Sequence, residues 1–144
     1  MPKNSQTFAN HKRNDPLFHL FMVPVAVISV IATAVRLVRF PSLGHGWLLV
    51  VAVAAMVAVF KIRFYALHVQ DRVIRLEERL RLMTVLKDPL RSRIEELTGS
   101  QLIALRFASD AELARLVELA LQEKLSRAEI KKSVIDWRPD YSRI

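Results

Sequence analysis

The residues best suited to metal chemistry lie near the start of the chain, where His11, Asp15 and His19 follow one another four residues apart. On a continuous helix these side chains would share one face, and both residue types are metal ligands. However, Pro16 and the expected capping role of Asp15 interrupt such a helix. We therefore favour a solvated His11 and a His19 at the level of lipid headgroups, and we predict no metal site and no cofactor.

Acid–base and nucleophilic chemistry have equally few candidates. The adjacent carboxylates Glu77-Glu78 and Glu95-Glu96 have arginines nearby that would keep them ionised, so we interpret them as solvated helix surface. The chain has no cysteine, no glycine-rich phosphate loop, no nucleophile elbow and no paired-histidine zinc motif. The sequence predicts a protein without catalytic residues, and a membrane-bound enzyme is the least supported reading.

The elements that would position these residues are dominated by two apolar runs. Residues 17–35 carry no charge over 19 positions, close to the roughly 20 that a helix needs to cross about 30 Å of hydrocarbon. The overall composition agrees, with 52% hydrophobic residues and a mean hydropathy of +0.22. A cleaved signal peptide is the main alternative. Pro24, Arg36 and the lack of a small-residue cleavage site argue against it.

The second run is shorter, with 14 uncharged residues at 47–60, but counting to Leu67 gives 21. Trp47 at one end and Lys61, Arg63 and Tyr65 at the other suit the two membrane interfaces. We predict transmembrane helices at 16–38 and 47–67, joined by a short external loop at 39–46 and therefore antiparallel. A hairpin that only dips into the bilayer stays open as an alternative.

Two details of the spans follow from residue type. Pro24 should kink the first helix, so that a bent first span is expected, and the hydroxyls of Ser29 and Thr33 could satisfy carbonyls that it frees. Small residues recur at helical spacing on both spans, which favours close packing within the hairpin over an oligomer interface. These residues are Ala26, Ser29, Thr33, Ala52, Ala54, Ala55 and Ala58.

The net charge of +8 is concentrated beside the apolar runs. Residues 1–16 and 61–86 hold nine Lys or Arg against four acidic residues, whereas residues 87–144 hold eleven against ten. The positive-inside rule then places both termini in the cytoplasm. The basic residues Lys12, Arg13, Lys61 and Arg63 form an expected collar for anionic lipid headgroups. A near-neutral distal region argues against nucleic acid as a partner.

The second span should continue as a cytosolic helical stalk at 68–87, since no Gly, Pro or cap intervenes. A heptad-like row along it could mediate self-association. The row consists of Val69, Val73, Leu76, Leu80 and Met83. Because Ile74, Leu82 and Leu86 widen the apolar face, we favour packing of the stalk on its own domain and keep self-association as the alternative.

Residues 88–144 predict a small cytosolic bundle of short helices. Asp88-Pro89 marks the start of the first, and capping-box spacing marks the others at Thr98/Gln101, Ser109/Glu112 and Ser126/Glu129. The apolar residues recur at helical spacing and should close one core against the stalk. The last helix should break at Pro139, with Trp137 and Tyr141 serving as a docking latch or, alternatively, as a partner-binding motif.

The orientation from the positive-inside rule makes 1–15 a cytosolic segment. Several further stretches of the chain are recognisable together: residues 9–11, 15–19, 65–67, 69–72, 75–80, 101–108 and 137–141. In these stretches the chain resembles an uncharacterised family of small bacterial two-span membrane proteins that carry a domain of unknown function. The resemblance covers nearly the whole chain. It implies a bacterial inner-membrane location and a plan of two spans followed by a helical tail, but no activity or ligand.

Together these features predict an all-α membrane protein, a two-helix transmembrane hairpin with a cytosolic stalk and bundle. We expect a membrane-anchored, non-enzymatic adaptor or scaffold. Its partners would be membrane lipids and either a second copy of the chain or a cytosolic protein. An oligomeric channel or a small transporter subunit is the alternative function.

Overall fold

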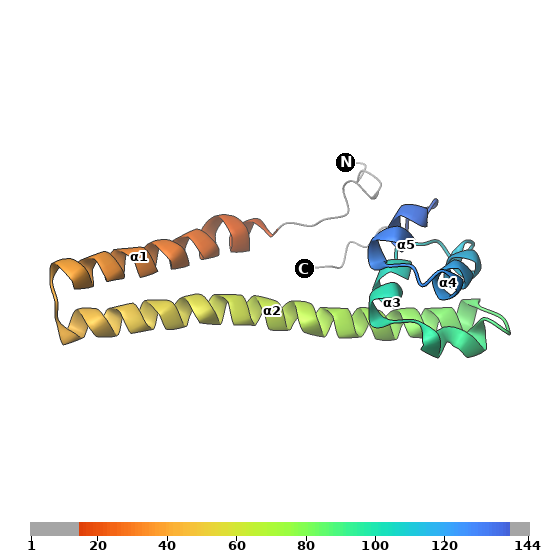
Figure 1. Ribbon diagram of the computed structural model, residues 1–144, viewed down its shortest axis with the longest axis horizontal. Coiled ribbons are helices and arrows are strands. Elements are labelled where there is room, and N and C mark those ends of the chain that lie inside the picture. Colours follow the sequence, from red (N-terminus) through yellow and green to blue (C-terminus); the bar gives the residue numbers. More distant parts are fainter. Residues whose placement is uncertain (1–14, 139–144) are drawn as a thin grey trace. The chain divides into compact units, whose positions relative to one another are not determined.

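The computed structural model describes residues 15–138, whose helices are shown in Figure 1. They form an N-terminal unit of residues 15–68 and a C-terminal unit of residues 69–138. No strand occurs within these described residues, which confirms the all-α prediction. The predictions for residues 1–14, including His11, Lys12 and Arg13, and for residues 139–144 lie outside them. The helices are η1 (Leu17–Met22), α1 (Val23–Arg39), α2 (Leu43–Val85), η2 (Arg91–Glu96), α3 (Gly99–Leu105), α4 (Leu113–Gln122) and α5 (Arg127–Ser133).

The first helix begins at the predicted cap. Asp15 Oδ1 accepts a hydrogen bond from Phe18 N at 3.2 Å, and Pro16 stands where its missing N–H leaves no helical bond unmade. The first six residues are π-helical, and the α-helix starts one residue before Pro24. A local π segment is one way in which helices accommodate a proline, and the bend predicted at Pro24 stays a prediction.

The prediction that the Ser29 and Thr33 hydroxyls bond to carbonyls freed by Pro24 is wrong. Ser29 Oγ donates to Val25 O at 2.8 Å, and Thr33 Oγ1 donates to Ser29 O at 2.8 Å. Neither hydroxyl reaches the carbonyl four residues before Pro24, because each bonds to the preceding turn of its own helix.

The connection between α1 and α2 is shorter than predicted. Three residues, 40–42, separate the helices, and α2 begins at Leu43 rather than at residue 47. Gly44, His45 and Gly46, which the sequence suggested as turn residues, lie in the first turn of α2.

His45 accounts for this early start. Its Nδ1 donates to Phe40 O at 2.6 Å, and its Nε2 accepts from Arg36 Nε at 2.9 Å. Its backbone N also donates to Ser42 Oγ at 3.1 Å, which satisfies one of the free N–H groups at the helix start. One side chain therefore joins the end of α1 to the beginning of α2.

Arg63 ties the other end of the hairpin. Its Nη1 lies 3.3 Å from Asp15 Oδ2, and its guanidinium carbon lies 5.4 Å from the centroid of the Phe18 ring. The Phe18 ring also meets the Phe60 ring edge-on, with centroids 6.0 Å apart. The two helices of the N-terminal unit are thus antiparallel neighbours, as predicted.

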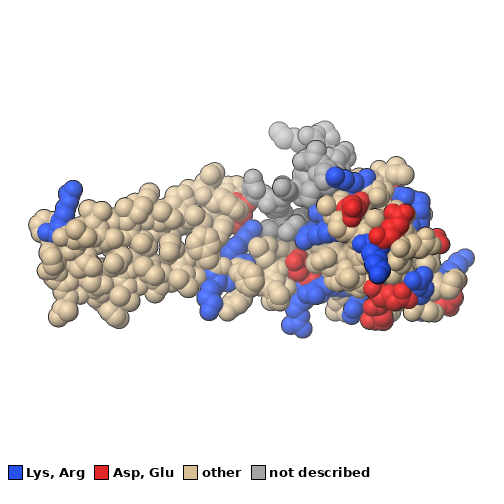
Figure 2. Space-filling model, viewed as in Figure 1, with Lys and Arg blue, Asp and Glu red and all other residues tan. Residues whose placement is uncertain are grey.

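The surface of the N-terminal unit is apolar. Two helical stretches are long and apolar enough to cross a membrane by length and composition, Leu17–Arg39 and Leu43–Val85. On the face shown in Figure 2 this unit is almost entirely free of charge, and its few charged side chains gather at its ends. None of the residues of α1 is buried.

In the C-terminal unit, one face of α2 packs on the short helices. Ile74, Leu82 and Leu86 are buried on this face, so the stalk packs on its own domain, as favoured from the sequence. This core confirms the prediction that apolar residues at helical spacing pack together against the stalk. Its members are Leu82, Leu86, Ile94, Leu97, Leu102, Ala104, Leu105, Ala108, Leu113, Leu116, Val117, Ala120, Ile130 and Val134.

Two of the three predicted capping boxes are present. Thr98 and Gln101 cap α3, and Ser126 and Glu129 cap α5, each with both reciprocal hydrogen bonds. The box at Ser109 is wrong, because α4 begins after Glu112 with no side-chain cap.

The first helix after the stalk also differs from its prediction. It is a 3₁₀-helix, η2, and it begins at Arg91 after a turn at residues 88–90. Ile94 and Leu97 are both buried, and their three-residue spacing matches the three residues per turn of a 3₁₀-helix.

Residues 134–138, which follow α5, are not helical. The predicted break at Pro139 is wrong, since α5 ends at Ser133. Trp137 pairs with Ala108 in an isolated antiparallel bridge, and the centroid of its ring lies 5.1 Å from the centroid of the Phe107 ring. For Trp137, these contacts support the docking latch over a partner-binding role.

Candidate functional site

The five residues predicted as a self-association row lie together on one exposed face of α2. Val69, Val73, Leu76, Leu80 and Met83 are between 40% and 60% exposed. The opposite face, with Leu82 fully buried, is the one that packs on the short helices of the C-terminal unit. We call these five residues the α2 row. Within the described residues the α2 row is an apolar helix surface that the core does not use.

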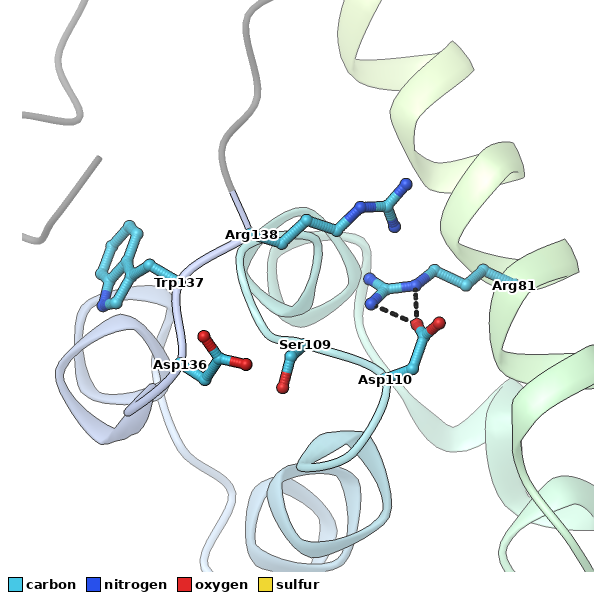
Figure 3. A pocket seen from close by; sticks show the side chains of 6 residues that line it. All are labelled: Arg81, Ser109, Asp110, Asp136, Trp137 and Arg138. Atoms are coloured by element: carbon cyan, nitrogen blue, oxygen red, sulfur yellow. Dashed lines mark hydrogen bonds and ion pairs between the residues drawn. The ribbon is translucent and has the colours of Figure 1, made fainter. Parts of the chain in front are cut away.

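A charged pocket lies on the same unit, built around Arg81. The pocket has a volume of about 280 Å³ and is lined by Arg81, Ser109, Asp110, Asp136, Trp137 and Arg138, as Figure 3 shows. Arg81 Nε donates to Asp110 Oδ1 at 2.7 Å, and Arg81 Nη2 donates to Ala108 O at 2.7 Å. One guanidinium therefore fastens the loop after α3 to α2.

Arg81 also holds the buried carboxylate of Glu78, whose Oε2 lies 3.1 Å from Arg81 Nη1. Glu78 is only 6% exposed, so the prediction that Glu77 and Glu78 are both solvated surface is wrong for Glu78. Burial raises the pKa of Glu78 above its ordinary value, because the charged form loses hydration. The charge and hydrogen bond of Arg81 oppose this shift without cancelling it.

The serine of this pocket lies between two carboxylates and bonds to neither. Figure 3 shows the side chains of Asp110 and Asp136 on either side of Ser109. The Ser109 hydroxyl is buried and makes no hydrogen bond within the described residues. Activating a serine requires a base within hydrogen-bond reach, and neither carboxylate bonds to this hydroxyl.

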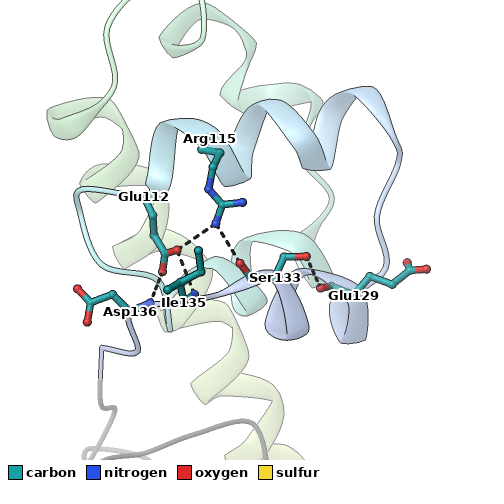
Figure 4. Close-up of polar contacts among 6 residues, drawn as sticks. All are labelled: Glu112, Arg115, Glu129, Ser133, Ile135 and Asp136. Atoms are coloured by element: carbon teal, nitrogen blue, oxygen red, sulfur yellow. Dashed lines mark hydrogen bonds and ion pairs between the residues drawn. The ribbon is translucent and has the colours of Figure 1, made fainter.

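Glu112 has a role that sequence reasoning missed. Its Oε2 accepts from Ile135 N at 3.1 Å and its Oε1 accepts from Asp136 N at 3.2 Å, as drawn in Figure 4. Arg115 Nη2 donates to Glu112 Oε2 at 3.1 Å and to Ser133 O at 3.0 Å. This carboxylate holds the bend at Ile135 and Asp136 after α5, and it is therefore not free to form a capping box with Ser109.

The two described residues of the predicted lipid collar, Lys61 and Arg63, have different surroundings. Arg63 is paired with Asp15, as described above, and its side chain is only 16% exposed. Lys61 has no carboxylate partner among residues 15–138, and its Nζ lies 5.7 Å from the centroid of the Tyr65 ring. Of these two residues, Lys61 is the one available to an external anion.

Asp15 and His19, the two described residues of those considered for metal binding, make ordinary helix-start contacts. His19 Nδ1 donates to Asp15 O at 2.9 Å, while the Asp15 carboxylate caps the helix and pairs with Arg63. Among residues 15–138, no group of three or more His, Cys, Asp or Glu is placed to hold a metal ion.

Comparison with known proteins identifies the family alone. No curated protein and no solved structure shows significant similarity to the chain. The model of a family of unknown function, DUF6526, matches residues 1–144. The match confirms the resemblance to an uncharacterised family that the sequence suggested. The chain therefore belongs to DUF6526, over its whole length.

Proposed function

We propose that the protein is a membrane-anchored, non-enzymatic helical adaptor of the bacterial inner membrane that associates with a second copy of itself through the α2 row. The N-terminal unit is the membrane anchor, and the C-terminal unit lies in the cytoplasm with both termini.

Three properties support the membrane anchor. The helical stretch Leu17–Arg39 has 23 residues, enough for about 30 Å of hydrocarbon. A core helix of a soluble protein would be buried, whereas none of the residues of α1 is. The basic residues that flank the two apolar stretches favour the cytoplasmic orientation of the termini.

The observation that carries the self-association is the exposure of the α2 row. Its spacing alternates between four and three residues, as in the a and d positions of a two-stranded coiled coil. Two anchored copies share one orientation in the membrane, so their stalks would meet in parallel.

Charges beside the row suit a parallel pair. With Val73 and Leu80 at a positions, Arg72 occupies a g position and Glu77 the following e position. Parallel two-stranded coils pair these positions between chains, so Arg72 of one copy would face Glu77 of the other. Both side chains belong to exposed residues of α2.

The oligomeric state tests this proposal. Light scattering of the full chain in detergent, with the detergent contribution subtracted, should give twice the 16.5 kDa chain mass. The double variant Val73→Asp/Leu80→Asp places charges on the row and should give a single chain mass with unchanged helicity. The matched variant Ala114→Asp/Ala128→Asp adds the same charge at exposed positions near the starts of α4 and α5 and should remain a dimer.

The charge pair offers a second test. Glu77→Arg should weaken the dimer by placing like charges opposite each other, and Arg72→Glu/Glu77→Arg should restore it. A single chain mass for the unaltered protein, at every concentration tested, would refute self-association and leave a cytosolic protein as the partner.

The alternative, an oligomeric channel or small transporter subunit, has less support. The hydroxyls of Ser29 and Thr33 bond to carbonyls of their own helix and leave less polar surface for a pore. Ion flux through liposomes that contain the purified dimer would favour this alternative over the adaptor.

A further inference from the structure

A second pocket of the C-terminal unit is lined by three arginines of α2. Arg72, Arg75 and Arg79, together with Leu76 and Gly99, surround a volume of about 270 Å³. Residues three, four and seven positions apart share one face of a helix, so the three arginines face the same way. The volume is just below the range of about 300–1,000 Å³ typical of small-molecule sites.

These arginines have little carboxylate neutralisation among residues 15–138. Arg79 Nη2 lies 3.6 Å from Glu95 Oε2, and both side chains are largely exposed, at 44% and 70%. Arg79 Nε is a buried donor with no acceptor in the described part of the chain. Arg72 and Arg75 form no ion pair with a described carboxylate. Three positive charges thus line one pocket, and among the described residues only Arg79 has a carboxylate partner, the exposed Glu95.

The position of Arg75 is set by two contacts. Its Nε donates to Asp71 O at 3.0 Å, and this bond does not use the two terminal nitrogens of the guanidinium group. Its Cδ and Nη1 lie where a side chain at position 99 would stand, since a Cβ built on Gly99 would be 2.9 Å and 3.1 Å from them. Gly99 therefore leaves room for the Arg75 side chain to cross the start of α3.

We propose that this pocket binds a phosphate group through Arg72, Arg75 and Arg79. Guanidinium groups present paired N–H donors that match the oxygens of phosphate, and several together favour a group with more than one negative charge or more than one free oxygen. The pocket shares Leu76 with the α2 row, and Arg72 is also the residue proposed to face Glu77 of a second copy. Arg75 and Arg79 take no part in the proposed dimer contacts, so binding through these two arginines does not depend on self-association.

Two sources could supply this group. Arg72 follows the predicted end of the second membrane span, Leu67, by five residues in the same helix, which favours the phosphate of an anionic lipid headgroup. The apolar side chain of Leu76 in the pocket lining would suit the organic part of either a lipid or a soluble phosphate ester.

The experiment uses the full chain in detergent and two probes. Inorganic phosphate is titrated by calorimetry, and phosphatidic acid is offered in competition with phosphatidylcholine, with retained lipid counted by native mass spectrometry. Preferential retention of phosphatidic acid without competition by inorganic phosphate assigns the site to lipid. Saturable binding of inorganic phosphate that also displaces the lipid assigns it to a soluble phosphate compound. Absence of both overturns the proposal.

Two variants localise the binding. Arg75→Gln/Arg79→Gln should weaken it at least about tenfold, whereas Lys87→Gln/Arg91→Gln, which removes the same charge at exposed positions of the same unit, should leave it unchanged. An equal loss in both would show a general effect of net charge and would refute a built site.

Gly99→Ala changes the position of the Arg75 side chain without changing the charge of the pocket. The added methyl group must displace the flexible end of Arg75, which is inexpensive for folding, and alanine is the better helix former. We expect phosphate binding several times weaker, with unchanged thermal unfolding and the same light-scattering mass. Unchanged binding in this variant would place the phosphate group elsewhere.

Discussion

Leu82 offers the most direct test of how α2 packs in the C-terminal unit. Its side chain is fully buried, whereas Leu80, two residues earlier in the same helix, is 58% exposed. Truncating a buried leucine costs about 2–5 kcal/mol, because contacts are lost and a cavity remains. Substitutions at exposed positions usually change stability by no more than about 0.5 kcal/mol. We therefore expect Leu82→Ala to destabilise the unit several times more than Leu80→Ala.

The stability that Leu82→Ala is expected to remove is a large part of the total free energy of unfolding of the C-terminal unit. At about 0.05–0.15 kcal/mol per residue, a unit of about 70 residues has a free energy of unfolding of about 3.5–10 kcal/mol. A urea dependence of about 1 kcal/mol per molar places the Leu82→Ala midpoint about 2 M or more below that of the unaltered chain.

The assay is urea unfolding in detergent, followed by the fluorescence of Trp137. A Trp47→Phe background removes the other tryptophan, which lies in the N-terminal unit. Repeating the measurement at tenfold lower protein concentration identifies any contribution from association through Leu80, because only that contribution depends on concentration. Equal midpoints for the two variants at both concentrations would refute the packing of α2 through the Leu82 face.

Two further predictions concern Glu112 and Glu78. Glu112→Ala should lower the free energy of unfolding by about 1–3 kcal/mol, because the N–H groups of Ile135 and Asp136 lose their acceptor, while Ser109→Ala should change it by less than about 0.5 kcal/mol; urea midpoints check both, and a larger loss at Ser109 would restore its capping role. Because burial raises the pKa of Glu78, the folded unit binds this proton more tightly than the unfolded chain. Its contribution to stability is therefore full below the ordinary pKa of 4.5 and falls as the pH rises through the raised value. Subtracting the stability of Glu78→Gln from that of the unaltered chain across pH isolates this contribution, and a difference that is flat or increases with pH would contradict it.

Local signals in the sequence predicted local structure well. The caps at Thr98 and Ser126 depend on residues three positions away, and both formed as expected. Asp15 likewise caps the first helix. The same signal failed at Ser109, because Glu112 instead binds backbone groups more than twenty residues later in the chain. Sequence spacing contains no information about that competition.

The two faces of α2 show a different limit. Periodicity placed apolar residues both on the α2 row and on the Ile74, Leu82 and Leu86 face, and either could have packed on the domain. Which face of α2 packs on the domain depends on where the apolar side chains of the short helices lie, and that is a property of the folded unit. The arginine pocket was missed for a similar reason, since Gly99 is 24 residues from Arg75 in the sequence and only the packing of α3 on α2 brings them together.

The hairpin of the N-terminal unit is fastened at both ends, and this limits how its helices can move. His45 joins Arg36 and Phe40 at one end, and Arg63 holds Asp15 at 3.3 Å at the other. Sliding one helix past the other by a single turn is a displacement of about 5.4 Å, which would break both attachments together. A shear or piston movement between α1 and α2 is therefore opposed, and the hairpin is expected to tilt or rotate as one body.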